Sequence, residues 1–141
     1  MVIITGASRG VGEFLLNSFL DQKEFQLIGT YFNTQPIKNI KLFEKIDVTD
    51  MDQIKSFVQT RASGLKNITL INCAGISINE YAHKSDPSNW EKVVETNLFG
   101  TYNFIRALLP LMRDQRFGRI INFSSVVAVK PTPGVSAYAA S

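Results

Sequence analysis

Apolar residues occur along the chain in two patterns, as short continuous runs and at helical spacing. Short apolar runs cover residues 2–5, 26–32, 68–73 and 119–123, and a weaker run covers residues 41–48. Apolar runs of this length, bounded by glycine or polar residues, are typical of buried β-strands. Apolar residues recur at helical spacing in residues 11–20, 51–64 and 88–112. The pattern therefore predicts strands that alternate with helices.

Strands alternating with helices favour an α/β fold, a Rossmann-type doubly wound parallel sheet with helices on both faces. Thr49 and Asp50 offer an N-cap for the second helix. Pro110 is expected in the last turn of the long helix or at its end. Ligands of such sheets bind beyond the carboxyl ends of the strands, so the residues at those ends are the candidates for function.

Composition narrows the class of protein. The chain has 141 residues, of which 45% are hydrophobic and 19% charged, as expected for one globular domain over residues 1–141. Its net charge of +3 comes from scattered residues, which favours a solvated surface over a nucleic-acid interface. No apolar run is long enough to span a membrane, and the single cysteine excludes an intrachain disulfide. We expect a cytoplasmic protein with no nucleic-acid or membrane partner.

A glycine-rich turn, TGASRGVG at residues 5–12, follows the first strand. A turn that opens a helix presents free N–H groups and the positive end of the helix dipole, which suits a pyrophosphate. Gly6 permits the tight turn, Gly10 lets the backbone approach a ligand, and Gly12 lets helix and strand pack closely. The glycines do not follow the common G-x-G-x-x-G spacing, and a purely structural turn is the alternative.

The second predicted strand ends without an acidic residue at positions 30–33. A site that prefers NAD often carries an acid there to hold the ribose 2′-hydroxyl. Arg9, in the glycine turn, could instead contact a 2′-phosphate, which favours NADP over NAD. The alternative for Arg9 is a solvated loop cation.

The ends of the next strands carry further candidates. Asp47 can accept from an adenine amino group and Val48 can cover the ring, but Asp47 with residues 49–50 can equally cap the next helix. The small residues of NCAG (72–75) let the backbone approach a flat ligand. Cys73 is interpreted as a small core residue, and the lone His83 as a loop residue, so no metal site is predicted.

Taken together, these segments resemble the short-chain dehydrogenase/reductase family, in its compact single-domain branch. The matching segments are TGASRGVG (5–12), DV (47–48), NCAG (72–75), ETNLFG with Asn97, SS (124–125) and YAAS (138–141). They occur in family order over essentially the whole chain. The 3-oxoacyl-carrier-protein reductase-like group is the most similar part of the family.

The resemblance implies catalytic positions at Asn97, Ser125 and Tyr138. Ser125 would orient the substrate carbonyl, and Tyr138 would deliver or remove the proton. Asn97 would help order a water that relays protons, and a buried hydrogen bond from its side chain to backbone is the alternative. The implied cofactor-binding residues are Gly6, Ser8, Arg9, Gly10, Val11, Gly12, Asp47, Val48, Asn72, Ala74, Gly75 and Tyr138.

The family also has a lysine four residues after the tyrosine, on the same helix face. That position is 142, which lies beyond Ser141. We therefore expect a C-terminally incomplete reductase domain that is inactive and poorly stable as residues 1–141 alone. The resemblance further implies a homo-oligomer, a dimer or tetramer, in which the long helix pairs with its copy, although core packing explains its apolar side equally well.

The function predicted from the residues and the resemblance is an NAD(P)-dependent oxidoreductase that interconverts a carbonyl and a secondary alcohol of a small molecule. Two alternatives stay open. One is a non-catalytic dinucleotide-binding module or sensor, which has little need for Asn97, Ser125 and Tyr138 together. The other is a methyltransferase that uses S-adenosylmethionine, which the phosphate-suited turn and Arg9 disfavour.

Overall fold

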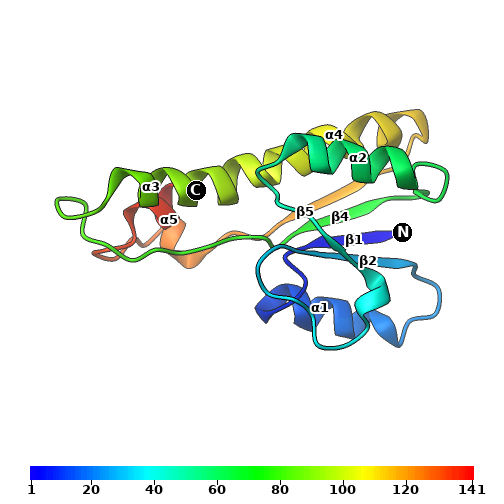
Figure 1. Cartoon of the computed structure of the whole chain (residues 1–141), viewed down its shortest axis with the longest axis horizontal. Coiled ribbons are helices and arrows are strands. Elements are labelled where there is room, and N and C mark those ends of the chain that lie inside the picture. The colour runs from blue at the N-terminus through cyan, green and yellow to red at the C-terminus, as the bar shows by residue number, and fades with distance from the viewer.

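The computed structural model describes every residue from Met1 to Ser141 and contains one sheet of five strands. The strands are β1 (Val2–Thr5), β2 (Leu27–Tyr31), β3 (Phe43–Lys45), β4 (Thr69–Asn72) and β5 (Arg119–Asn122). Their order is β3-β2-β1-β4-β5, and all neighbouring pairs are parallel. Helix α1 (Gly10–Leu20) covers one face of the sheet, and α2 (Met51–Arg61) and α4 (Gly100–Asp114) cover the other (Figure 1). The predicted doubly wound sheet with helices on both faces is confirmed.

Successive residues of β1 face opposite sides of the sheet and divide the core in two. Ile3 packs in a cluster with Phe104 and Leu108 of α4, together with residues of α2. Ile4 packs in a smaller cluster that includes Leu16 of α1. Both faces of β1 are buried, as the continuous apolar run of residues 2–5 requires.

The long helix predicted over residues 88–112 consists of three consecutive helical segments. These are α3 (Pro87–Val94), the π-helical turn η2 (Glu95–Phe99) and α4. The expectation for Pro110 needs a correction, because the helix continues past it to Asp114. Pro110 is exposed, so water can take the place of its missing backbone N–H. Apolar spacing alone could not locate the π-helical turn, because it shifts the helical register by only one residue.

Three short elements complete the chain. Residues predicted as a strand over 41–48 form the 3₁₀ turn η1 (Ile40–Leu42) before the shorter β3. After β5 come the 3₁₀ turn η3 (Val126–Ala128) and helix α5 (Ser136–Ala140), which packs beside α3 beyond the sheet (Figure 1). Strand β5 forms one edge of the sheet, and all four of its residues are exposed.

None of the helices combines the length and apolar character that crossing a membrane requires.

Candidate functional site

A cavity of about 860 Å³ lies at the carboxyl ends of the strands, where the fold predicts a ligand site. The turn after β1, the ends of β2 and β3, the segment after β4, and α3 with η2 all contribute to its wall. Of the residues predicted from the sequence, eleven line it: Gly6, Ser8, Arg9, Gly10, Val11, Gly12, Asp47, Val48, Ala74, Gly75 and Tyr138. The tertiary structure therefore brings the glycine turn and Tyr138 to one cavity.

The glycine turn is shaped by positions where a side chain would not fit. Gly6 has a φ of +63°, and a Cβ there would lie 2.7 Å from the Cα of Ala74. A Cβ on Gly12 would lie 2.5 Å from the carbonyl oxygen of Gly6, so the start of α1 contacts the turn directly. Gly10 has a φ of +58° with no atom within 4 Å of a Cβ position, which leaves open space beside its backbone. The backbone of this turn is thus accessible to a ligand.

The N-terminus of α1 meets the cavity without a protein cap. Arg9 occupies the N-cap position, and its side chain makes no capping hydrogen bond. The first amide groups of a helix have no partner within the helix and carry the positive end of its dipole. With the exposed guanidinium of Arg9 beside them, these groups form an electropositive wall that suits an anion such as a phosphate.

The end of β2 adds polar and aromatic residues that the sequence did not single out as ligand contacts. Tyr31, Phe32, Asn33 and Thr34 line the cavity, and none of them is acidic. Thr30 also contributes to this wall; the residue is 1% exposed, and its buried Oγ1 has no hydrogen-bond partner in the protein. A buried hydroxyl without a partner is uncommon.

Thr5 joins the ends of β1 and β4. Its Oγ1 accepts hydrogen bonds of 3.1 Å from the backbone N–H groups of both Cys73 and Ala74. This contact sets the position of the NCAG segment against the glycine turn. Burial raises the pKa of the Cys73 thiol to about 11, so the thiol is protonated at neutral pH. Cys73 is half-buried: it packs against the smaller core cluster, as interpreted, and it also lines the cavity.

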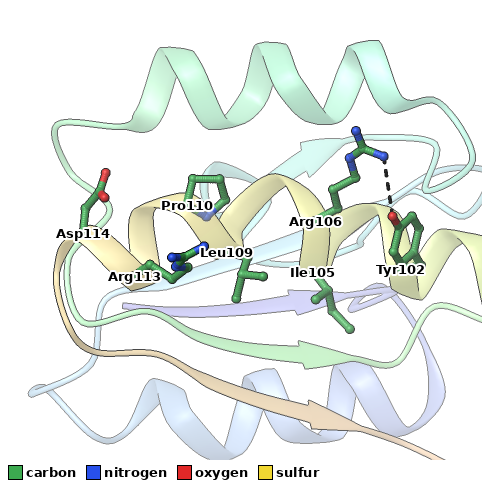
Figure 2. Close-up of a pocket in the computed structure, with 7 residues that line it drawn as sticks. All are labelled: Tyr102, Ile105, Arg106, Leu109, Pro110, Arg113 and Asp114. Atoms are coloured by element: carbon green, nitrogen blue, oxygen red, sulfur yellow. Dashed lines mark hydrogen bonds between the residues drawn. The ribbon is translucent and has the colours of Figure 1, made fainter.

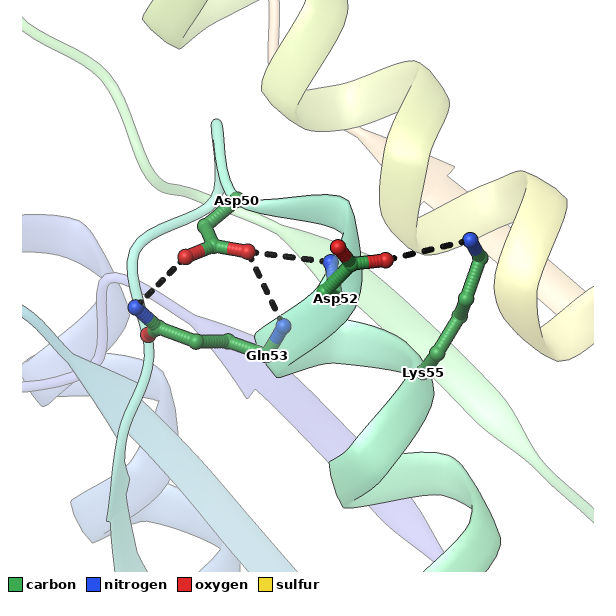
Figure 3. A network of polar contacts seen from close by, with 4 residues as sticks. All are labelled: Asp50, Asp52, Gln53 and Lys55. Carbon is green, nitrogen blue, oxygen red and sulfur yellow. Dashed lines mark hydrogen bonds and ion pairs between the residues drawn. The ribbon is translucent and has the colours of Figure 1, made fainter.

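The segment after β3 separates two roles that the sequence left open. Asp50, not Asp47, is the N-cap of α2, since its carboxylate accepts from the backbone N–H groups of Asp52 and Gln53 (Figure 3). The hydrogen bond from the Gln53 N–H is the main cause that lowers the pKa of Asp50. Asp47 lines the cavity, and its Oδ1 accepts from the N–H and the hydroxyl of Thr49 at 2.9 and 2.8 Å.

Asn72 lies outside the cavity wall. Its side chain is 4% exposed, and its Nδ2 donates to Oδ1 of Asn122 on the neighbouring strand at 2.9 Å. The amide therefore bridges β4 and β5 behind the site. Asn72, Ala74 and Gly75 were all predicted to bind the cofactor; Ala74 and Gly75 line the cavity, and Asn72 does not, because its amide bonds to the neighbouring strand.

Asn97 lies within the π-helical turn η2 and bonds to backbone. Its Oδ1 accepts from the N–H of Ile76 at 2.8 Å, and its Nδ2 donates to the Ile76 carbonyl at 3.0 Å and to Oγ of Ser141 at 2.9 Å. These partly buried hydrogen bonds from side chain to backbone correspond to the alternative interpretation of Asn97. Asn97 itself does not line the cavity, whereas Ile76 does.

The remaining catalytic candidates are Ser125 and Tyr138. Ser125 is the N-cap of η3, and its Oγ accepts from the N–H of Val127 at 3.2 Å. Tyr138 is half-buried on α5 and lines the cavity, which Ser125 does not. Lys92, Glu95 and Thr96 of the long helix also line it, although the sequence did not single them out. The sequence places Lys92, Glu95 and Thr96 on one side of the helix, three and four residues apart. This spacing fits an exposed helix face equally well, so it does not identify a ligand site.

Comparisons with known proteins agree with this architecture. The family model described as short chain dehydrogenase matches residues 1–141. The chain is 33% identical to a 3-oxoacyl-(acyl-carrier-protein) reductase of Thermotoga maritima, over 99% of this chain and 61% of that protein. It is 31% identical to an uncharacterized oxidoreductase of Staphylococcus saprophyticus, over 98% of this chain and 59% of that protein. The chain thus spans about 60% of the length of these curated relatives.

Solved structures give the same result. The crystal structure of serine dehydrogenase from Escherichia coli superposes with a TM-score of 0.89 at 30% identity, covering 99% of this chain and 68% of that one. The closed form of serine dehydrogenase complexed with NADP+ superposes with a TM-score of 0.90 at 29% identity, covering 99% and 60%. The family match over the whole chain, the fold and the ordered motifs lead to one conclusion: the chain belongs to the short-chain dehydrogenase family.

Proposed function

We propose that the protein is an NADP(H)-dependent oxidoreductase that interconverts a carbonyl and a secondary alcohol of a small molecule. The observation that carries this proposal is the single cavity that joins the glycine turn to Tyr138. The turn suits the phosphates of a dinucleotide, and the tyrosine supplies a titratable hydroxyl at the other part of the wall. A relative of similar sequence is named a 3-oxoacyl reductase, and a similar structure is named as an NADP+ complex.

The residues of the cavity fit a dinucleotide. The uncapped N-terminus of α1, with Gly6, Ser8, Gly10, Val11 and Gly12 around it, would hold the pyrophosphate. Ala74 and Gly75, small residues after β4, would let the backbone approach the flat part of the ligand.

NADP is favoured over NAD by charge. No acid stands at the end of β2, where it would bind a ribose 2′-hydroxyl and repel a 2′-phosphate. Arg9 lies on the same cavity wall, and a guanidinium binds phosphate with charge-assisted hydrogen bonds.

Asp47 and Val48 would recognise the adenine. The second carboxylate oxygen of Asp47 forms no hydrogen bond in the protein, and neither does the backbone N–H of Val48. An acceptor beside a donor is complementary to the amino group and the ring nitrogen N1 on the edge of adenine. The same pair presents the wrong polarity to hypoxanthine, which carries a carbonyl oxygen and an N1–H there.

A bound reduced nicotinamide supplies the hydride. Tyr138 would donate the proton to the carbonyl oxygen in reduction and accept it in oxidation. Ser125 would orient that oxygen by donating its hydroxyl hydrogen, which stays available while Oγ accepts from the N–H of Val127. Asn97 would act through the backbone of Ile76, because both N–H groups of its amide donate there and to Ser141 and its oxygen accepts from the Ile76 N–H.

An unperturbed phenol titrates near pH 10, so a tyrosine acid needs a nearby cation to work near neutrality. The lysine expected four residues after Tyr138 lies outside residues 1–141. We therefore propose that residues 1–141 by themselves bind the dinucleotide but do not turn over substrate. As part of the same proposal, residues 1–141 form a dinucleotide-binding Rossmann domain, and the protein is cytoplasmic.

The outer face of α4 is the proposed surface for self-association. A hollow of about 470 Å³ runs along it, lined by Tyr102, Ile105, Arg106, Leu109, Pro110, Arg113 and Asp114 (Figure 2). This face combines exposed apolar side chains with charges of both signs, so two copies related by a twofold axis would be self-complementary. Light scattering on the wild type and on Leu109→Glu tests it, and a variant with the oligomeric state of the wild type would contradict the surface.

The function is tested first by binding and then by turnover. Residues 1–141 are titrated with NADPH, NADH and S-adenosylmethionine; NADPH should bind most tightly, and binding of S-adenosylmethionine alone would overturn the proposal. The natural protein, as it is produced in its own cell, is then assayed with NADPH and acetoacetyl-CoA. The variant Tyr138→Phe is assayed in the same way. The variant should lose a factor of about 10² to 10⁴ in rate. Binding without turnover by the wild type would favour the alternative of a dinucleotide-binding module.

A further inference from the structure

The Asp47–Val48 segment is held in place by side chains from two helices that are not part of the cavity wall. It follows β3 and precedes α2, so it lies in no strand or helix of its own. Both residues line the cavity, and Val48 is 7% exposed. A loop that presents hydrogen-bonding groups to a ligand needs some other structure to fix their direction.

The first contact comes from α2. Oε1 of Gln53 accepts from the backbone N–H of Asp47 at 3.0 Å, and Nε2 of the same side chain donates to Oδ2 of Asp50 at 2.8 Å. Asp50 in turn caps α2 (Figure 3). Gln53 therefore links the loop to the N-terminus of α2. Its amide oxygen bonds to the loop at Asp47, and its amide nitrogen bonds to the cap at Asp50.

The second contact comes from α4. Nδ2 of Asn103 donates to the carbonyl of Val48 at 3.1 Å, and the donor is partly buried. One turn earlier, a Cβ on Gly100 would lie 2.5 Å from Cγ2 of Val48, so the helix backbone packs directly on this side chain. Only a residue without a side chain at position 100 lets Asn103 come this close to the loop.

These two contacts use the N–H of Asp47 and the carbonyl of Val48, and the turn bond from the Asp50 N–H uses the carbonyl of Asp47. The N–H of Val48 and the second carboxylate oxygen of Asp47 are left without a protein partner. We infer that Gln53 and Asn103 are positioning residues that aim this acceptor and donor at the adenine edge of the dinucleotide. The inference rests on the proposed function and assigns its base specificity to two residues outside the cavity.

The test compares two ligands that differ only at the base, NADPH and its hypoxanthine analogue. Wild-type protein should bind the analogue more weakly by about tenfold or more, because both polar groups of the base edge are reversed. Asn103→Leu and Gln53→Met, alone and together, should reduce this ratio towards about two, because the loop can then turn its groups away. Loss of fold in a fraction of the molecules weakens both ligands by the same factor and leaves the ratio unchanged.

Lys55→Met is the matched control, since Lys55 lies on α2 and Asp52 is the partner of its ammonium group (Figure 3). It should keep the wild-type ratio. Asn103→Asp, which keeps the size of the side chain but replaces the donor by an acceptor, serves if the leucine variant does not fold.

The outcomes separate the two proposals. Wild-type protein that binds neither ligand contradicts the proposed function. Wild-type protein that binds both equally well contradicts recognition of the base by this loop. Variants that keep the wild-type ratio, or that lose affinity for both ligands by the same factor, overturn the positioning role of Gln53 and Asn103.

Discussion

Asn97 holds the backbone of Ile76 with both atoms of its amide, accepting from the N–H at 2.8 Å and donating to the carbonyl at 3.0 Å. Because Ile76 lines the cavity and Asn97 does not, the polar residue of the long helix supports the wall of the site from behind. The π-helical turn that contains Asn97 is the local distortion that accompanies this contact.

Asn97→Ala is expected to destabilise the protein by about 1 to 3 kcal/mol, because it leaves two partly buried backbone groups of Ile76 without partners. Urea unfolding followed by circular dichroism measures the change. Asn17→Ala is the control, since Asn17 is an exposed helical asparagine of α1. Equal stability of the two variants would show that the Ile76 contact contributes nothing.

Arg9→Gln should weaken NADPH binding by about tenfold or more and leave NADH binding within about twofold, since only the 2′-phosphate loses its charged partner. Fluorescence titration of both cofactors gives the two dissociation constants. Lys23→Gln removes a positive charge just after α1 and should leave both unchanged. If Arg9→Gln weakens the affinity for both cofactors by the same factor, this would argue against a contact with the 2′-phosphate.

Gly100→Ala should cost about 1 to 3 kcal/mol of unfolding free energy, because its Cβ would lie 2.5 Å from Cγ2 of Val48. Gly64→Ala is a suitable comparison, since the atom nearest to a Cβ there is 3.6 Å away. Chemical denaturation of both variants checks this. If Gly100→Ala unfolds at the wild-type urea concentration, α4 does not pack on Val48 as described.

The capping carboxylate of Asp50 makes part of the stability depend on pH. Hydrogen bonds, first that from the Gln53 N–H, hold the pKa of Asp50 below its usual value in the folded protein. Its contribution is therefore complete above the unfolded pKa near about 4 and is lost as the pH falls through the lower folded pKa. Asp50→Asn should be less stable than wild type near neutrality, and the difference should shrink in acid.

Thermal unfolding between neutral pH and the acid range follows this difference. Asp52→Asn is the matched control, because its carboxylate pairs only with the exposed ammonium of Lys55. A gap between Asp50→Asn and wild type that stays constant with pH would mean that the cap does not act through its charge.

The thiol of Cys73 should react slowly. With a pKa of about 11 in the folded protein against 9.0 for a free thiol, its thiolate fraction near about pH 8 is lower by about a hundredfold. Alkylation by iodoacetamide should slow by a similar factor relative to protein unfolded in urea, as followed by mass spectrometry. Rapid alkylation of the folded protein would contradict the burial of this side chain.

The raised pKa of Cys73 also sets how the contribution of its thiol to stability changes with pH. The folded state binds the proton more tightly than the unfolded state, so the contribution is complete below the unfolded pKa of 9.0 and is lost as the pH rises towards about 11.

The sequence alone determined the fold class and predicted most of the wall of the cavity. Strand and helix periods predict the sheet, and the rule that ligands bind at strand ends selects Gly6, Arg9, Asp47 and Ala74 from the sequence alone. These residues lie in turns directly after strands, so their place follows from local patterns. Pro110 was harder to interpret, because whether a helix continues past a proline depends on the solvation of the carbonyl left without a partner.

The tertiary structure decided which polar side chains face the cavity and which hold it from behind. Asn72, Asn97 and Gln53 are polar residues of similar character, yet the first bridges two strands, the second fixes Ile76 and the third fixes Asp47. Hydrogen-bond partners far apart in the sequence are set by how helices pack on the sheet, which spacing along one chain does not encode. The same reason separates Asp47 from Asp50: both follow a strand, and only the packed loop shows that Asp50 caps the helix and that Asp47 lines the cavity.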